Sequence, residues 1–146
     1  DVFSRAIVGW KVSTRMNTDM VLDALEQALH DRGMPKNVIH HSDRGVQYLS
    51  IRYTNRLEAA NLRASVGTTG DSYDNALAET VNGLYKTEVI EYLKADWQGL
   101  ADVQLATLNW VDWFNKERVH SALGYVSPFE FEAMYYDKIN PLGQVA

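Results

Sequence analysis

The stretch that decides the fold is residues 38–45, Val-Ile-His-His-Ser-Asp-Arg-Gly. The short apolar run at its start predicts a strand over residues 38–41, and Asp43 falls just past the end of that strand. Ligand sites in open α/β sheets form beyond the carboxyl ends of strands, so this position favours a binding role for Asp43. The alternative is a turn aspartate, because Asp-Arg-Gly is also a good turn sequence. Asp43 alone does not decide between the two interpretations.

A second acid, Glu79, closes residues 73–79, Tyr-Asp-Asn-Ala-Leu-Ala-Glu, and residues 44–78 separate it from Asp43. The pattern predicts a helix from about residue 74 to residue 92. Its inner stripe is formed by Leu77, Thr80, Val81 and Leu84. Glu79 lies far from that stripe, which suits a metal ligand and equally a solvated glutamate. Two carboxylates of this kind are what a two-metal phosphoryl-transfer site needs, because hard divalent cations take carboxylate oxygens.

Strands and helices alternate along the rest of the chain. Strands are predicted over residues 6–12 and 62–66, and helices over residues 18–32, 50–61, 100–116 and 128–134. Asn17 and Ser127 are the expected N-caps of the first and last helices. Val103, Leu108, Trp110, Val111 and Phe114 are the expected anchors of the helix over residues 100–116. This alternation predicts an α/β layer with a largely parallel sheet.

The composition of the 146 residues fits one globular domain, residues 1–146, with 46% hydrophobic and 23% charged residues. No apolar run approaches the length of a membrane span. There is no cysteine, which excludes disulfides and thiolate metal sites. The formal net charge of −5 is unusual for a free-standing DNA-binding module. Any DNA contact is therefore expected to be local, or to be made mainly by a module outside this chain.

Four separated segments together resemble one family. Besides the two acidic segments, residues 113–131 read Trp-Phe-Asn-Lys-Glu-Arg-Val-His-Ser-Ala-Leu-Gly-Tyr, then Val, then Ser-Pro-Phe-Glu-Phe. Residues 1–10 read Asp-Val-Phe-Ser-Arg-Ala-Ile-Val-Gly-Trp. These segments and the interval between the acids resemble the DDE polynucleotidyl transferases with an RNase H-like core. The likeness is strongest to transposases of bacterial insertion sequences, and it covers nearly the whole chain.

The resemblance implies a retroviral integrase-like mixed sheet flanked by helices. It also implies three acids that bind two Mg²⁺ or Mn²⁺ ions, so that a DNA 3′ hydroxyl or a water attacks a phosphodiester. Asp43 and Glu79 carry over as catalytic metal ligands. The family's first aspartate has no counterpart, because Asp1 matches the acid at the end of the second strand. We therefore expect an N-terminally truncated core that begins after the first catalytic strand and is inactive by itself.

Truncation would leave a gap in the sheet. Residues 6–12 could then move beside residues 38–41, or a second copy could supply the pairing, because bare strand edges invite association. A homodimer or higher oligomer is therefore expected.

The resemblance implies DNA, both transposon ends and target, as the partner, and a bacterial cytoplasmic, nucleoid-associated location. Lys86 lies two helical turns beyond Glu79 on the same face. Lys86, Arg44, Arg118 and His120 are the candidates for phosphate contacts. The alternatives are a solvated surface charge for Lys86 and a structural hydrogen bond for His120.

Two other functions remain open. One is a stand-alone RNase H-like nuclease, which the tail of residues 113–131 and the glycine-containing loop over residues 67–72 disfavour. The other is a remnant that only dimerises or binds DNA, which the missing first aspartate favours. Metal binding at Asp43 and Glu79 would separate the enzyme from such a remnant.

Overall fold

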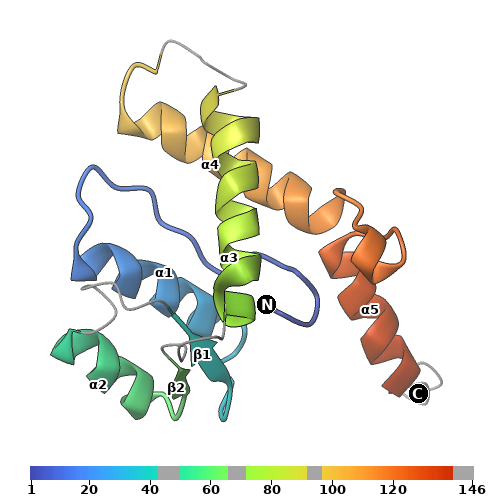
Figure 1. The fold of residues 1–146 in the computed structure, drawn as a ribbon, viewed down its shortest axis with the longest axis horizontal. Coiled ribbons are helices and arrows are strands. Elements are labelled where there is room, and N and C mark those ends of the chain that lie inside the picture. The colour runs from blue at the N-terminus through green and yellow to red at the C-terminus, as the bar shows by residue number, and fades with distance from the viewer. Residues whose placement is uncertain (43–49, 66–71, 92–96, 140–146) are drawn as a thin grey trace. The chain divides into compact units, whose positions relative to one another are not determined.

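The computed structural model describes residues 1–42, 50–65, 72–91 and 97–139, apart from the side chains of residues 65 and 72–75 (Figure 1). The elements in chain order are α1 (Thr18–Asp31), β1 (Ile39–His41), α2 (Ile51–Ala59), β2 (Arg63–Ser65), α3 (Ser72–Tyr85), the π-helix η1 (Lys86–Glu91), α4 (Leu100–Lys116), the 3-10 turn η2 (Ser121–Leu123) and α5 (Pro128–Ile139). The predicted alternation of helices with the strands at residues 38–41 and 62–66 is confirmed. The last helix extends five residues past its predicted end at Met134.

The chain divides into two compact units. Unit 1 contains residues 1–7 and 105–146, and unit 2 contains residues 8–104, so the boundary falls within α4. The prediction of one domain over residues 1–146 stays a prediction. No helix among the described residues is long and apolar enough to cross a membrane.

The core of unit 2 lies between α1 and α2. Asn17 caps α1 as predicted, since its side-chain oxygen accepts a hydrogen bond from the Met20 N–H at 3.0 Å. The buried side chains recur at helical spacing and are Val21, Leu25 and Leu29 of α1 with Tyr53 and Leu57 of α2. Burying an apolar side chain of this size contributes about 1.5–3 kcal/mol, so this cluster stabilises unit 2 substantially.

The described sheet is one parallel pair, β1 with β2, which lie side by side in Figure 1. Ile39 pairs with Arg63, His40 with Ala64 and His41 with Ser65. A parallel pair needs a crossover connection, and α2 supplies it. The larger mixed sheet expected from the resemblance is represented in the described residues by these two strands.

The predicted strand over residues 6–12 is wrong, because the backbone there is extended but pairs with no described strand. It therefore does not move beside residues 38–41. Side-chain amides take the place of a neighbouring strand. In unit 1, Asn115 accepts a hydrogen bond from the Ile7 N–H at 2.8 Å and donates one to the Ile7 carbonyl at 2.9 Å. In unit 2, Gln27 of α1 accepts from the Trp10 N–H at 2.8 Å.

Gly9 lets this extended segment lie against α1. A Cβ at Gly9 would stand 2.3 Å from the Ala24 carbonyl oxygen and 3.0 Å from the Ala28 Cβ. Both distances are shorter than ordinary contacts, and the first is to backbone that cannot turn away. Glycine is required at this position because the backbone lies so close to α1, and not because of its backbone angles.

Unit 1 is built around the end of α4 and the start of α5. Ser127 caps α5 as predicted, because its hydroxyl accepts from the Glu130 N–H at 3.3 Å while the Glu130 carboxylate accepts from the Ser127 N–H at 3.3 Å. Phe114 is fully buried and Val111 is buried, as predicted for anchors of α4. Leu108 is 51% exposed, so its prediction as an anchor is wrong. It stands on the outer side of the helix, about 120° from Phe114 at 100° per residue.

Candidate functional site

Asp43 and Arg44 lie in residues 43–49, outside the described part of the chain, but both flanks of that segment are described. On one side, β1 ends at His41. On the other side, Ser50 begins α2, and its hydroxyl accepts a hydrogen bond from the Tyr53 N–H at 3.2 Å. The strand-to-helix turn expected around Asp43 therefore has a described strand before it and a capped helix after it.

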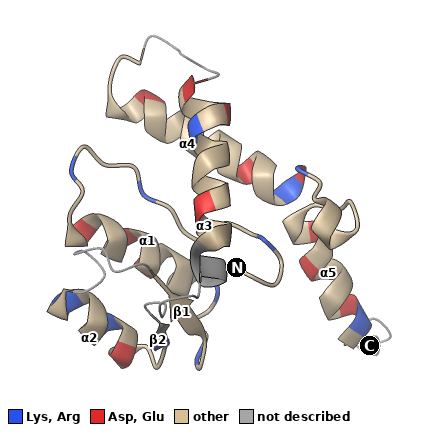
Figure 2. Ribbon diagram, viewed as in Figure 1, with Lys and Arg blue, Asp and Glu red and all other residues tan. Residues whose placement is uncertain are grey.

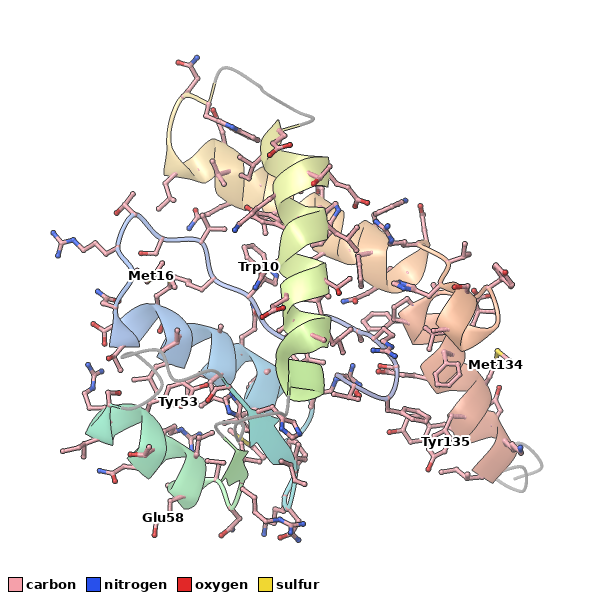
Figure 3. All side chains as sticks on the ribbon, viewed as in Figure 1. Trp10, Met16, Tyr53, Glu58, Met134 and Tyr135 are labelled. Atoms are coloured by element: carbon pink, nitrogen blue, oxygen red, sulfur yellow. The ribbon has the colours of Figure 1, made fainter. Side chains whose placement is uncertain are left out.

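Tyr53 also contacts the strand side. Its hydroxyl is hydrogen-bonded to Nε2 of His40 at 2.7 Å, and the two rings lie 5.5 Å apart. Tyr53 is only 2% exposed and is directed from α2 into the core (Figure 3). Burial lowers the pKa of His40, and the neighbouring His41 lowers it further. The His40 imidazole is therefore neutral at pH 7.

Glu79 lies on α3 and is exposed, as its distance from the inner stripe predicts. Leu77, Val81 and Leu84 are half-buried on the opposite side of the helix, whereas Thr80 is exposed and does not belong to the stripe. Among the described residues, no basic side chain forms an ion pair with Glu79. An exposed carboxylate that is not already paired within the described chain is available to a cation.

Helix geometry changes at Lys86, where α3 passes into the π-helix η1. A continuous α-helix, at about 100° per residue, would turn Glu88 onto the stripe and Val89 about 110° away from it. A π-turn adds one residue to the turn and moves every later residue back by one position. Val89 then joins the apolar stripe, which agrees with its 1% exposure. The sequence pattern predicts a helix here, but the π-turn was not predicted.

Lys86 keeps its place on the Glu79 face because the change in geometry begins with it. Seven residues separate the two, so at about 100° per residue they stand about 20° apart around α3. Both are exposed. Within the described chain no carboxylate pairs with Lys86. The structure thus brings Glu79 and Lys86 onto one helix face, as predicted.

Arg118 and His120 lie together in unit 1 beside Phe114. The Arg118 guanidinium carbon is 5.6 Å from the centres of both the Trp113 and Phe114 rings. His120 meets Phe114 edge-on at 5.0 Å. Its Nε2 is buried and has no hydrogen-bond partner among the described residues, and burial, followed by the charges of Arg118 and Arg5, lowers its pKa.

Charge on α2 is neutralised within unit 2. Arg52 pairs with Asp19 at 2.7 Å, and Arg56 pairs with Glu26. The lowered pKa of Glu26 reflects its hydrogen bond from Arg56. Figure 2 shows basic positions on α2 and acidic positions on the neighbouring α1. The arginines of α2 are therefore weaker candidates for DNA contacts than Lys86.

Two functional candidates were missed from the sequence, Tyr53 and Asn115. For Tyr53 the available signal was its helical spacing from Leu57, because a tyrosine buried at such a position needs a partner for its hydroxyl. Asn115 was noted only as part of the resembling tail. An asparagine within an apolar stripe, next to Phe114, was the available signal, because buried polar groups are hydrogen-bonded.

In the described residues, no three histidine, aspartate or glutamate side chains gather into a metal-binding group. The donor chemistry of Glu79 nevertheless fits Mg²⁺ or Mn²⁺, since both favour carboxylate oxygens. The distance from Glu79 to Asp43 lies outside the described residues, so the prediction that the two acids approach each other stays a prediction.

Models of known protein families match this sequence along most of its length. Two family models, both described as the integrase core domain, match residues 1–72 and 60–128. The chain belongs to the integrase core family. The predicted resemblance is thereby confirmed.

Relatives of this integrase core are insertion-sequence transposases. The chain is 55% identical over 139 residues to the transposase for insertion sequence element IS629 of Shigella sonnei, covering 95% of this chain and 46% of the relative. It is 54% identical over 141 residues to the putative transposase for IS986/IS6110 of Mycobacterium tuberculosis (strain ATCC 25618 / H37Rv), covering 93% of this chain and 50% of the relative. The chain spans about half the length of the curated relatives it matches.

Solved structures with a similar fold are retroviral integrase cores. The HTLV-2 integrase catalytic core domain in complex with magnesium, in its trimeric form, matches with a TM-score of 0.64 at 20% identity, covering 90% of this chain and 79% of that chain. The catalytic core domain of BIV integrase matches with a TM-score of 0.61 at 18% identity, covering 88% and 80%. The RNase H-like α/β fold predicted for this integrase core is confirmed.

Proposed function

We propose that the chain is the catalytic core of a DNA transposase, which cleaves phosphodiester bonds and joins strands at transposon ends. The observation that carries the proposal is the α3 face that presents Glu79 and Lys86 together, both exposed and neither paired within the described chain. Identity of 54–55% to insertion-sequence transposases over more than nine-tenths of the chain supports it. The complete activity is proposed for a full-length transposase that contains this chain.

Asp43 and Glu79 are proposed to hold two Mg²⁺ or Mn²⁺ ions. When bound, such ions polarise the scissile phosphate and stabilise the charge on the attacking and leaving oxygens. The protein's own part is to hold the two carboxylates within reach of one another. Glu79 would do so from an exposed helix face, and Asp43 from the segment between β1 and α2.

Lys86 is proposed to bind a DNA phosphate next to the metal ions. Its place on the Glu79 face supports this, since a phosphate on the metals would lie near the same face. Arg44 is proposed for a second phosphate contact, because it follows Asp43 directly in the sequence. Contacts of this kind position DNA and do not read its sequence.

Arg118 and His120 are proposed as further phosphate contacts, with unequal support. The Trp113 and Phe114 rings beside Arg118 favour a fixed place for its guanidinium, and this planar group suits phosphate oxygens. The buried Nε2 of His120 and its lowered pKa favour the alternative, a neutral imidazole that helps to build the turn at η2. Homodimers or higher oligomers on DNA complete the proposal, with bare strand edges as the argument for association.

The test is a strand-joining assay with Mn²⁺ on a transposon-end duplex, using a full-length transposase that contains this chain. Asp43→Asn and Glu79→Gln should each abolish joining while binding to the DNA end is largely retained. Glu91→Gln is the matched control, since Glu91 is an exposed acid on the adjoining η1 and should leave joining unchanged. Full joining by Glu79→Gln would overturn the proposal, and cleavage of RNA–DNA hybrid in place of transposon ends would favour a nuclease.

A further inference from the structure

Arg5 in unit 1 is held in a backbone conformation that an arginine rarely adopts. Its φ is +67°, in the left-handed region that disfavours residues with a Cβ. Its N–H donates to the carbonyl of Asp1 at 2.8 Å. The Ser4 hydroxyl spans the residue, because it accepts from the Ala6 N–H at 3.3 Å and donates to the Glu132 carboxylate of α5 at 2.6 Å. Strained residues of this kind persist only where the surrounding structure fixes them, and they gather at binding sites.

The chain after Arg5 is fixed as firmly as the chain before it. Asn115 of α4 makes two hydrogen bonds with the backbone of Ile7, at 2.8 and 2.9 Å. Ser4 and Ala6 are at most 2% exposed, whereas Arg5 between them is half-buried and keeps part of its surface in contact with solvent. Arg5 is thus a solvent-accessible arginine on a backbone that unit 1 holds from both sides.

Arg118 brings a second guanidinium to the same part of unit 1. Its guanidinium carbon lies 5.6 Å from the centre of the Phe114 ring, and His120 meets that ring edge-on at 5.0 Å. Phe114 directly precedes Asn115, so this ring and the amide that holds the Arg5 segment belong to one turn of α4. Burial, then the charge of Arg118, then the charge of Arg5 lower the pKa of His120, so both cations act on one imidazole.

No acidic side chain within the described residues forms an ion pair with Arg5. The acids of its own surroundings have other donors, because Asp1 accepts from the backbone of the turn and Glu132 accepts from Ser4. Two cations close to one imidazole repel each other, and an anion bound between them would offset that repulsion. Nε2 of His120 is buried, so the guanidinium groups and not this nitrogen can reach a ligand.

We infer that Arg5 and Arg118 together form a site for one phosphate group of the DNA backbone. The inference deepens the proposed function and rests on it, because it takes DNA as the ligand. Guanidinium groups suit this ligand, since each can donate two parallel N–H bonds to phosphate oxygens. The contact positions DNA on unit 1 and does not read its sequence.

A salt titration of end binding tests the site, with Arg5→Gln and Arg118→Gln in a full-length transposase that contains this chain. Each variant should bind the transposon-end duplex about tenfold more weakly at low salt, with a reduced dependence of affinity on salt. The double variant should lose less than the product of the two single effects, because both arginines hold one phosphate. Arg15→Gln is the matched control, an exposed arginine in the loop before α1, and should bind like the wild type. Wild-type binding by Arg5→Gln, or fully multiplicative effects in the double variant, would overturn the inference.

The strained backbone separates DNA binding from a structural role. Glycine adopts a positive φ without steric cost, so Arg5→Gly should bind DNA as weakly as Arg5→Gln and yet melt at no lower temperature than the wild type. Met34→Gly is the backbone control, since Met34 has a φ of +54° and is 51% exposed. It should keep both the melting temperature and the affinity for DNA. A clear loss of thermal stability in Arg5→Gly would assign the arginine to packing within unit 1 and overturn the inference.

Failure of this inference is distinguishable from failure of the proposed function. If Asp43→Asn and Glu79→Gln abolish joining while Arg5→Gln binds DNA like the wild type, the phosphate site alone is wrong. If Asp43→Asn joins DNA as well as the wild type, the proposed function fails, and the salt titrations still decide the phosphate site. If Arg5→Gln keeps its affinity for DNA and instead lowers the oligomeric mass, the two arginines bind acidic side chains of a second copy, which also overturns the inference.

Discussion

The two carboxylates of the proposed site stand on parts of unit 2 that are held very differently. The flanks of Asp43, β1 and α2, are joined to a core in which Leu29, Tyr53 and Leu57 are each at most 3% exposed. On α3, by contrast, no side chain from Ala76 to Lys86 is buried, and the first buried residue is Val89 beyond the π-turn. The flanks of one acid thus belong to a packed core, whereas the other acid stands on a helix with a half-covered apolar stripe.

This difference predicts that the residues that stabilise the fold and the residues that bind metal and DNA are largely separate. Substitutions in the α1–α2 core should lower the free energy of unfolding, and they should reduce activity only because less of the protein is folded. Substitutions on the outer face of α3 should act on metal and DNA while folding hardly changes. Substitutions in both regions test this division.

Leu29→Ala should have the largest effect on stability, a loss of about 2–5 kcal/mol in the free energy of unfolding, because it opens a cavity in the α1–α2 core. Leu29 is 3% exposed. Chemical denaturation of the purified chain measures the loss. Ile51→Ala is the control, since Ile51 is 77% exposed on the same helix pair and should change stability by less than about 0.5 kcal/mol. Equal losses for the two variants would contradict the division.

Lowering the pH should destabilise the part of unit 2 that contains β1 and α2, because His40 is half-buried there. Its pKa is lowered in the fold from the usual 6.5, so the unfolded chain binds a proton at a higher pH than the folded chain does. Stability is therefore unaffected above about pH 7.5 and falls as pH drops below 6.5 toward the folded pKa, at about 1.4 kcal/mol per unit of pKa difference. Thermal melts between pH 8 and 5 measure it.

Two histidine variants locate the source of this pH dependence. His40→Asn should flatten the fall in stability, and His120→Asn in unit 1 should do so independently, because its pKa is lowered as well. A profile that is as steep in His40→Asn as in the wild type would show that the buried imidazole does not titrate on unfolding.

Deleting Thr87 should convert η1 to a continuous α-helix at a cost below about 1 kcal/mol, because the deletion removes the extra residue of the π-turn and leaves Val89 on the apolar stripe. Lys86 should stay on the Glu79 face. Deletion of Ala106 in α4 is the control. It should rotate Val111 and Phe114 by about 100° away from their packing and lower the melting temperature sharply. Melting curves and far-ultraviolet circular dichroism compare the two deletions. Similar losses of stability and helix content in both would contradict the idea that the π-turn places Val89 on the apolar stripe.

Sequence reasoning succeeded where one pattern determines one structure and failed where tertiary contacts choose. The apolar spacing and Asn17 gave α1 with its cap, and the distance of Glu79 from its stripe gave its exposure. The extended residues 6–12 were predicted as a strand because local pattern cannot tell a backbone partner from the amides of Asn115 and Gln27. The sequence contains a signal for the π-turn, since a continuous α-helix would place the charged Glu88 on the apolar stripe and turn Val89 away from it. Tyr53 could not be connected to His40 without the packing of α2.

The smallest expected effect on folding belongs to Lys86→Ala, below about 0.5 kcal/mol, because Lys86 is an exposed charge on the outer face of the helix. Its effect on DNA should be clear. Losing one phosphate contact weakens end binding and reduces the slope of log affinity against log salt concentration by about one. Lys36→Ala is the matched control, since Lys36 is an exposed lysine in the loop before β1 and has no assigned contact. A salt titration of end binding by both variants in a full-length transposase decides the matter. If Lys86→Ala keeps the wild-type slope, Lys86 is a solvated surface lysine, and the α3 face serves the metal ions through Glu79 without gripping DNA.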